Sequence, residues 1–268
     1  MLLAVDIDNT QITFGLFEDL NANTVSKSFK VATDINRTSD EYAVIIDGIL
    51  GYYKIDRTLI NVAVISSVVP MLTDVIKNSI IRLAEQAEIL TVGKGIKTGF
   101  PIKIDNPSEL GTDLVANAAA VIDIKNKENK TKCPCIIIDM GTATTVFAVN
   151  ANGEYIGGSI LPGVGISLDV LHGKTAQLPN VTPAAPAHAI GKNSSESVRS
   201  GVILGNAMMI DGFVRKFSVE MKCGDKAEVF ITGEYSEAVI PYCEHAMRYV
   251  PELTLMGLLC IYRNNIKS

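Results

Sequence analysis

The stretch Asp6-Ile7-Asp8-Asn9-Thr10 joins two apolar segments near the start of the chain, residues 1–5 and residues 11–17. In residues 11–17, large apolar side chains alternate with smaller or polar ones, which is the period of a β-strand. Asp and Asn between two such segments favour a tight turn. The sequence therefore predicts a β-hairpin with this stretch at its tip.

A second stretch of the same kind, Asp139-Met140-Gly141-Thr142-Ala143-Thr144-Thr145, follows the apolar residues 135–138 and precedes the apolar residues 146–149. Here too an apolar strand reaches an Asp, small or hydroxylated residues follow, and another strand begins. The two stretches predict two similar β-hairpins, one in each half of the chain.

Hydrophobic periodicity predicts further elements that repeat in the same order in both halves. In the first half these are a strand at 26–31, a helix at 39–53 with Ser39 as its N-cap, a strand at 61–69, a helix at 71–86 and a strand at 89–92. In the second half they are strands at 155–161 and 228–232 and a helix at 194–224. The simplest explanation is a duplicated α/β unit, with domains at 1–115 and 116–268 and a ligand cleft between them.

Length and composition agree with a folded protein of two modest domains or one large one. The chain has 268 residues, of which 47% are hydrophobic and 20% charged, and one domain usually takes roughly 100–200 residues. The net charge is −5 and no basic block is present, so nucleic acid is not an expected partner.

The N-terminus and the cysteines favour a cytoplasmic location. The apolar residues 1–5 end at Asp6, far short of the roughly 20 residues of a membrane helix, so no membrane association is expected. The five cysteines do not suggest a disulfide framework. Cys133 and Cys135 lack a second Cys or His pair, so we expect buried thiols there and no metal site.

The two Asp loops carry groups that suit a phosphate. An Asp at the end of a buried strand can hold Mg²⁺, while turn N–H groups and hydroxyls bind phosphate oxygens. Each loop taken alone could be an ordinary hairpin turn. Two such loops at matching places favour one split phosphate site, whose side-chain and turn donors would be Asn9, Thr10, Gln11, Thr13, Gly141, Thr142, Thr144 and Thr145.

Asp113 is a third candidate carboxylate, just before the apolar residues 115–122. At the start of a helix, partial positive charge would keep it ionised and able to accept a proton. A purely capping acid is the open alternative.

The three histidines have no Ser or Cys partner at a catalytic spacing, and the chain has no GxSxG, HExxH or complete P-loop pattern.

Many short motifs, taken in order, resemble the type III pantothenate kinases of the acetate and sugar kinase, Hsp70 and actin superfamily. The resemblance covers nearly the whole chain. The motifs are the Asp6 loop, Ser66-Ser67-Val68-Val69-Pro70, Gly95-Ile96-Lys97-Thr98-Gly99, Asp105-Asn106-Pro107, Gly111-Thr112-Asp113, the Asp139 loop, Gly157-Gly158, Pro162-Gly163, Gly191-Lys192-Asn193, Thr232-Gly233 and Pro251-Glu252-Leu253-Thr254-Leu255 with Gly257.

The resemblance implies an α/β fold of duplicated RNase H-like, actin-like ATPase domains with an ATP cleft between them, and a homodimer. It implies phosphoryl transfer from ATP to the primary hydroxyl of pantothenate, the first step toward coenzyme A. Asp113 would be the base, Asp6 would bind Mg²⁺, Asp139 would bind K⁺ or NH₄⁺, and Thr142 would contact ATP. The phosphate loop would be Asp6, Ile7, Asp8, Asn9, Thr10, Gln11, Ile12 and Thr13. The acceptor would contact Ile104, Gly111, Thr112, Asp113, Leu114 and Ser194.

Several positions depart from the family pattern. Asp8 and Glu234 stand where Gly is usual and add charge near the nucleotide, Ile104 stands in place of Tyr, and Ser194 in place of Thr. Leu114 stands in place of an Arg that would pair with the pantothenate carboxylate, a contact worth roughly 1.5–3 kcal/mol. These departures leave two alternatives open: a kinase for another small alcohol, and a non-catalytic paralogue.

Overall fold

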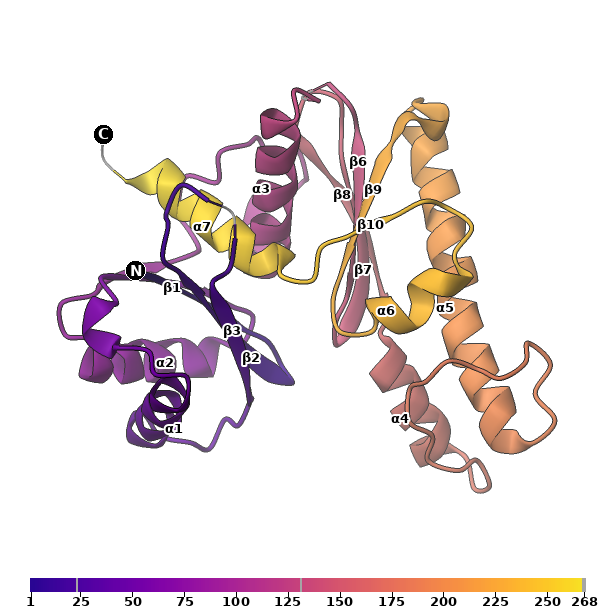
Figure 1. Ribbon diagram of the computed structural model, residues 1–268. Coiled ribbons are helices and arrows are strands. Elements are labelled where there is room, and N and C mark those ends of the chain that lie inside the picture. Colours follow the sequence, from indigo (N-terminus) through magenta and orange to yellow (C-terminus); the bar gives the residue numbers. More distant parts are fainter. Residues whose placement is uncertain (23, 131, 267–268) are drawn as a thin grey trace. The chain divides into compact units, whose positions relative to one another are not determined.

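The structure, a computed structural model, describes residues 1–22, 24–130 and 132–266 (Figure 1). It forms two compact units: Met1–Gly99, Asn106–Ile124 and Glu252–Ser268 make the first, and Phe100–Asp105 and Lys125–Pro251 make the second. This division differs from the expected boundary after residue 115. The α3 helix (Thr112–Lys127) continues through that point, and the C-terminal helix α7 (Leu253–Asn265) packs on the first unit's sheet.

The first unit is built on a five-stranded sheet. Its strand order is β3 (Lys27–Ala32), β2 (Gln11–Phe17), β1 (Leu2–Ile7), β4 (Val62–Ser67), β5 (Glu88–Thr91). The central strand β1 is antiparallel to β2 and parallel to β4. All six of its residues are buried, as expected for a strand covered on both faces.

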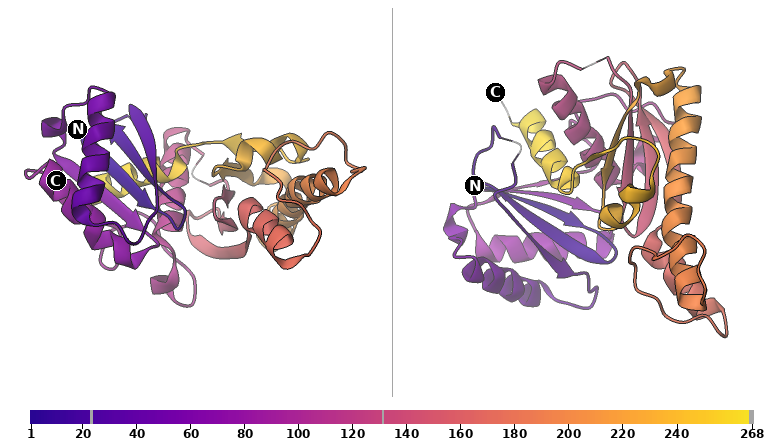
Figure 2. Two further views of the ribbon diagram at one scale, coloured as in Figure 1. Left: turned by 90° about the horizontal axis from the view of Figure 1, so that it is seen from below. Right: turned by 45° about the vertical axis from the view of Figure 1, so that its right-hand side comes forward.

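Helices cover the two faces of this sheet. Figure 2 shows α1 (Ser39–Tyr52) and α2 (Pro70–Leu83) together on one face, where they pack on the β1 side chains Leu3, Val5 and Ile7. α7 contacts β1 and β4, and its Leu255 lies against Gly15 of β2. Gly15 pairs with Ala4 in the sheet, so α7 lies on the opposite face, the one that also carries Asp6.

The second unit repeats the first. Its strand order is β10 (Arg248–Tyr249), β9 (Glu228–Thr232), β6 (Cys135–Met140), β7 (Ala143–Val149), β8 (Tyr155–Pro162). The central strand β6 is antiparallel to β7 and parallel to β9. Each strand therefore has a counterpart in the first unit, and the predicted duplicated RNase H-like fold is confirmed.

The helices of the second unit include α4 (Val164–Lys174), the 27-residue α5 (Ser194–Glu220) and the short α6 (Ser236–Val239). Four short 3₁₀ turns complete the described elements: η1 (Arg57–Leu59), η2 (Pro107–Glu109), η3 (Gly224–Lys226) and η4 (Ile240–Tyr242). Apolar residues of α4 and α5 bury the β6 side chains Ile136, Ile138 and Met140. None of the helices in the described part of the chain has the length and apolar character needed to cross a lipid bilayer.

Some predicted details are wrong. The N-cap of α1 is Thr38, which forms a reciprocal capping box with Glu41, so Ser39 is the first helical residue. The strand expected at 135–138 runs to Met140, and Asp139 therefore lies within it. Cys133 is only half-buried and precedes the strand. The α4, α7 and β10 elements were not predicted, because their apolar residues show no sustained period.

Candidate active site

Asp6 lies at the carboxyl end of β1 with hydroxyl residues on both sides. In the sheet it pairs with Thr13 of β2 and with Ser66 of β4. Its side chain is buried, with 6% of the residue exposed. A carboxylate in this position is held rigidly by three strands, which suits a group that must meet a ligand in a fixed geometry.

The loop after Asp6 is a tight turn that a neighbouring segment holds in place. The N–H of Asp8 donates to the Gln11 carbonyl (3.1 Å). Thr33 clamps the turn from outside: its hydroxyl donates to the Asp8 carbonyl (2.6 Å) and its N–H donates to the Thr10 carbonyl (3.1 Å). Asn9 and Thr10 at the tip are exposed to solvent. The predicted hairpin is therefore present, with its polar tip accessible.

Asp8, which departs from the family pattern, fits this turn without backbone strain. Among the described non-glycine residues, left-handed backbone occurs at Lys54, Asn129 and Lys222. Asp8 is not one of them, so its backbone conformation does not require glycine. The effect of this substitution is therefore electrostatic and steric, through a carboxylate beside the loop.

Asp139 has the same surroundings in the second unit that Asp6 has in the first. In the sheet it pairs with Thr145 of β7 and Thr232 of β9. The hydroxyl oxygens of Thr144 and Thr145 are buried and have no hydrogen-bond partner among the described residues. The two Asp loops thus occupy equivalent registers of the duplicated fold.

Gly233 shapes the neighbourhood of the second loop. Its φ is +97°, and a Cβ at this position would collide with the backbone of Met140. Only glycine meets both conditions, because it alone adopts this conformation at low cost and lacks the clashing atom. The turn after β9 therefore lies directly against the end of β6, next to Asp139.

Asp113 is the second residue of α3, and Thr112 fixes the start of that helix. The Thr112 hydroxyl oxygen lies 2.9 Å from the Ser66 hydroxyl and accepts from the Ser67 N–H (3.1 Å). It also lies 3.1 Å from the Ser67 carbonyl, to which it can donate. Since Ser66 pairs with Asp6 in the sheet, the first unit gathers Asp6, Ser66, Thr112 and the start of α3 at one edge.

The Asp113 carboxyl is a stronger base than a solvent-exposed aspartate. Burial raises its pKa above the ordinary value, although the backbone N–H groups of Leu114 and of Asp113 itself act in the opposite direction. Desolvation therefore outweighs these contacts at the helix start. A Cβ at Gly111 would collide with the Asp113 Oδ1 atom, so glycine at 111 leaves room for this carboxylate.

The expected acceptor residues divide between the units. Gly111, Thr112 and Leu114 lie in the first unit and Ile104 and Ser194 in the second. Leu114 is buried, with 8% exposed, so it packs inside the first unit and presents no charge. Ile104 is half-buried and lies near Gly157, where an added Cβ would be 3.8 Å from its methyl group.

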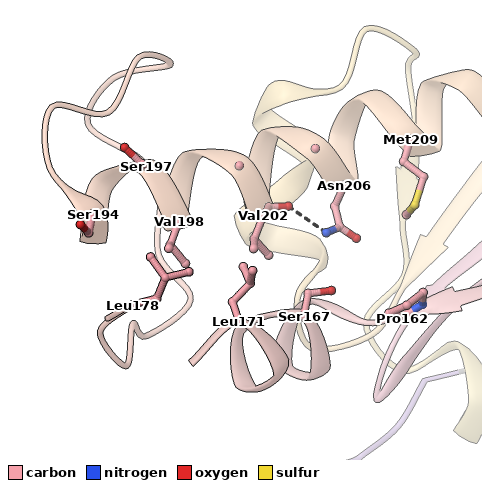
Figure 3. A pocket seen from close by; sticks show the side chains of 12 residues that line it. Pro162, Ser167, Leu171, Leu178, Ser194, Ser197, Val198, Val202, Asn206 and Met209 are labelled. Atoms are coloured by element: carbon pink, nitrogen blue, oxygen red, sulfur yellow. Dashed lines mark hydrogen bonds between the residues drawn. The ribbon is translucent and has the colours of Figure 1, made fainter. Parts of the chain in front are cut away.

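Ser194 is the first residue of α5 and lines a cavity of about 750 Å³ between α4 and α5 (Figure 3). Asn206 contributes the cavity's most buried polar group. Its Nδ2 donates to the Val202 carbonyl (2.8 Å), while its Oδ1 is buried without a hydrogen-bond partner in the described residues. The cavity is lined by Pro162, Ser167, Leu171, Leu178, Ser194, Ser197, Val198, Gly201, Val202, Gly205, Asn206 and Met209.

The sequence did not reveal the roles of Ser66 and Asn206. Ser66 belongs to a motif of the family resemblance, but nothing in its spacing connects it to Thr112, which is 46 residues away. Asn206 lies within an apolar helical stretch, where a single Asn could equally be exposed. Both roles depend on contacts between elements that are distant in the chain.

Comparison with known proteins identifies the family. A family model described as type III pantothenate kinase matches residues 2–216. A type III pantothenate kinase from Moorella thermoacetica is 37% identical over 266 residues, which cover 99% of this chain and 100% of the relative. One from Pelobacter propionicus is 37% identical over 265 residues, with the same coverage.

Solved structures with a similar fold are more distant in sequence. A Campylobacter jejuni protein described as a Baf family transcriptional activator is 18% identical, with a TM-score of 0.59 and coverage of 98% of both chains. A Sinorhizobium meliloti protein described as a 2-dehydro-3-deoxygalactonokinase is 12% identical, with a TM-score of 0.57 and the same coverage. These likenesses concern the fold alone. The full-length sequence matches show that the chain belongs to the type III pantothenate kinase family.

Proposed function

We propose that this chain transfers the γ-phosphoryl group of ATP to the primary hydroxyl of pantothenate, forming 4'-phosphopantothenate. The proposal rests on family membership and on one structural observation. Asp113, the expected base, has a raised carboxyl pKa and starts a helix that Thr112 anchors to the strand beside Asp6. Both expected ends of the reaction, the base and the phosphate loop, therefore have an ordered framework.

In this proposal Asp113 accepts the proton of the pantothenate hydroxyl as its oxygen attacks phosphorus. A base works best when its pKa approaches the pH at which it operates, so the burial that raises the pKa of Asp113 favours this role. Phosphoryl transfer depends mainly on position and charge neutralisation. A carboxylate fixed by a helix start is suited to such a task.

The phosphate loop of Asp6, Ile7, Asp8, Asn9, Thr10, Gln11, Ile12 and Thr13 would hold the ATP phosphates, with Thr142 as a further contact. The described residues contain no cluster of three or more His, Cys, Asp or Glu that could form a protein-only metal cage. Mg²⁺ in kinases needs only one or two carboxylates together with phosphate oxygens and water. Asp6 fits this requirement, and Mg²⁺ bound there would neutralise phosphate charge.

Asp139 would hold a monovalent cation, K⁺ or NH₄⁺. The buried hydroxyl oxygen of Thr145, directly opposite Asp139 in the sheet, has no hydrogen-bond partner within the described residues. Carboxylate and hydroxyl oxygens suit a hard cation.

The acceptor would contact Ile104, Gly111, Thr112, Leu114 and Ser194. This set has no cationic side chain to pair with the pantothenate carboxylate.

We also propose a homodimer in the cytoplasm. The resemblance to the family supports the homodimer, and the side chains of Ile160 on the edge strand β8 and of Met208 and Val219 on α5 are largely exposed. All five cysteines are free thiols, which fits a reducing compartment. Sedimentation velocity would report the oligomeric state directly.

A coupled ADP-release assay with ATP, Mg²⁺, K⁺ and pantothenate tests the activity. We expect turnover in the native chain, its loss in Asp113→Asn, and no change in Asp74→Asn, which removes an exposed carboxylate of α2. Nucleotide binding without turnover on pantothenate would favour a kinase for another alcohol. Absence of both signals would favour a non-catalytic paralogue.

The buried Leu114 is the observation that favours the altered-acceptor alternative, since it leaves an apolar side chain where the family places a cation. The double variant Leu114→Arg with Ile104→Tyr tests this point. We expect it to lower the KM for pantothenate about tenfold or more, the gain of one charge-assisted contact. An unchanged KM would contradict the assignment of these two positions.

A further inference from the structure

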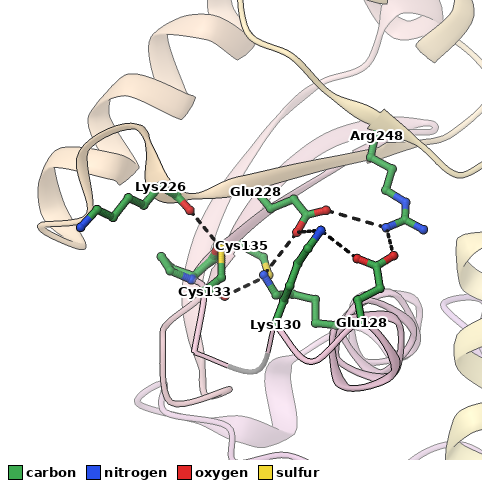
Figure 4. Close-up of polar contacts among 9 residues, drawn as sticks. Glu128, Lys130, Cys133, Cys135, Lys226, Glu228 and Arg248 are labelled. Carbon is green, nitrogen blue, oxygen red and sulfur yellow. Dashed lines mark hydrogen bonds and ion pairs between the residues drawn. The ribbon is translucent and has the colours of Figure 1, made fainter.

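Two thiols lie together away from the candidate active site, on the turn that leads into β6. Cys133 is half-buried, and its Sγ donates to the Lys226 carbonyl (3.0 Å). Cys135, the first residue of β6, is buried, and its Sγ lies 3.7 Å from the Cys133 carbonyl. Figure 4 shows both thiols within a group of charged side chains. One thiol is thus accessible to small solutes, and the other lies behind it.

Pro134 between them fixes a backbone that a disulfide can bridge. Proline locks its own φ and keeps the preceding residue, Cys133, out of helical conformations. Two trans peptide bonds hold Cα atoms two residues apart at roughly 5–7 Å. That range overlaps the range of disulfides, and a bond between residues this close in the chain would be strained and readily reduced.

A buried cation lies beside the two thiols. Lys125, at the end of α3, is 3% exposed. Burial acts to lower its pKa, but the nearby Cys135, Cys133 and Glu228 outweigh that effect, and the pKa is raised. Lys125 is therefore an ammonium at neutral pH, and it lies beside both thiols.

The positive charge of Lys125 is only partly balanced. Its Nζ is 3.4 Å from a Glu228 carboxylate oxygen. The same carboxylate also lies 3.8 Å from Lys130 Nζ and 3.8 Å from Arg248 Nη1. Glu228 thus divides its single charge among three cations, although Lys130 and Arg248 also reach Glu128. The ammonium of Lys125 remains able to stabilise a negative charge that develops on sulfur.

We propose that Cys133 is a peroxide-sensitive modification site whose oxidation ends in a Cys133–Cys135 disulfide. In the first step the Cys133 sulfur attacks one peroxide oxygen, the O–O bond breaks, and the sulfur becomes a sulfenic acid while the other oxygen leaves as water or an alcohol. In the second step the Cys135 sulfur displaces the sulfenic hydroxyl, which leaves as water with the Cys135 proton. Two thiols are oxidised and one peroxide is reduced.

The two cysteines have different roles in this reaction because their environments differ. Burial raises the pKa of the Cys135 thiol to about 12, so Cys135 is protonated at neutral pH and does not react with peroxide first. Cys133 is the more accessible of the two thiols, and the Lys125 ammonium lies near both. The order of events therefore follows from the structure: Cys133 is oxidised and Cys135 resolves it.

Hydrogen peroxide titration of the full chain, read by mass spectrometry of peptides, tests the proposal. Cys223 is the internal control because it is also half-buried but has no second cysteine within two residues. We expect Cys133 to be consumed at least tenfold faster than Cys223, with a two-hydrogen loss on the peptide that holds Cys133 and Cys135. In Cys135→Ser we expect a sulfenic acid at Cys133 that dimedone traps.

The role of the cation is tested with Lys125→Met and Lys125→Arg. We expect Met to slow Cys133 oxidation severalfold and Arg to preserve most of the rate, with Cys223 unchanged in both. Equal rates at Cys133 and Cys223 in the native chain would overturn the proposal, and this comparison does not depend on any variant folding. Equal sulfenic acid yields in the native chain and in Cys135→Ser would overturn the disulfide step.

Discussion

The hydroxyl oxygen of Thr112 lies 2.9 Å from that of Ser66 and joins the first turn of α3 to the end of β4. The same Thr112 oxygen bonds the backbone of Ser67. Because Asp113 follows Thr112 directly, this contact fixes the place of the Asp113 carboxylate, which we propose as the base. Positioning of this kind contributes to phosphoryl transfer as much as the identity of the base does.

Thr112→Val tests this anchor with a side chain of the same shape. The loss of two or three hydrogen bonds should lower the free energy of unfolding by about 1–3 kcal/mol, measured by urea denaturation. It should also lower kcat, since the α3 start is no longer fixed. Thr112→Ser keeps the hydroxyl and should retain most of both. A valine variant with native stability and native kcat would show that the contact is incidental.

Asp113→Asn should remove activity and yet stabilise the fold. Loss of the base should reduce kcat/KM by about 10²–10⁴-fold. Burial raises the pKa of Asp113, so its ionised form is disfavoured in the folded state, and a neutral Asn avoids that penalty at pH 7. Thermal unfolding at pH 7 should therefore give a higher Tm for the variant. A lower Tm would mean that the charge has a favourable partner.

The pH dependence of kcat/KM should show the same carboxyl. In the proposed mechanism Asp113 must be ionised to accept a proton, so the rate should fall as the pH is lowered through its pKa in the free enzyme. Because burial raises that pKa above the ordinary 3.8, the acid limb should have its midpoint above 3.8. The measurement is a kcat/KM profile at constant ionic strength. A midpoint at or below 3.8 would argue against Asp113 as the titrating group.

Asp211 of α5 should stabilise the fold in a pH-dependent way. Its carboxylate accepts from the N–H groups of Glu244 (2.8 Å) and His245 (3.2 Å) and lies 2.8 Å from His245 Nδ1. Burial alone would raise its pKa, but these hydrogen bonds outweigh it and the pKa is lowered. Its contribution is therefore present above the unfolded pKa and is lost as the pH falls through the folded pKa.

Asp211→Asn should accordingly lower the free energy of unfolding by about 1.5–3 kcal/mol at pH 7. The difference between native and variant chains should shrink as the pH is lowered below about 4. Urea denaturation at several pH values measures both. Asp225→Asn, at an exposed position, serves as the control and should change neither. A difference that stays constant with pH would contradict the assignment.

The sequence predicted the parts of this molecule that depend on local pattern. Alternating apolar residues and the polar turn around Asn9 predicted the first hairpin, and the matching stretch around Thr142 predicted its counterpart. Local pattern did not predict that Asp139 lies within a strand. Its polarity suggested a loop, but the backbone pairs with Thr145 and Thr232 on both sides, and ladder hydrogen bonds do not depend on side-chain polarity.

The raised pKa of Asp113 and the contact of Thr112 with Ser66 could not be predicted either, because both depend on contacts between distant elements. The helix start was visible in the sequence, and it suggested stabilisation of the charge. Desolvation, however, depends on which elements close around a side chain, and these come from distant parts of the chain. The same is true of α7, whose contact with β1 joins residues more than two hundred positions apart.

The placement of α7 has a consequence for synthesis on the ribosome. The first unit contains the N-terminal strands but is completed by α7, whose Leu253, Leu255 and Leu258 are buried. Until that helix emerges, the face of β1 that carries Asp6 and the side of α3 at Ala116, which touches Gly257, lack the cover that α7 provides. The nascent first unit must therefore wait, partly open, while the whole second unit is translated.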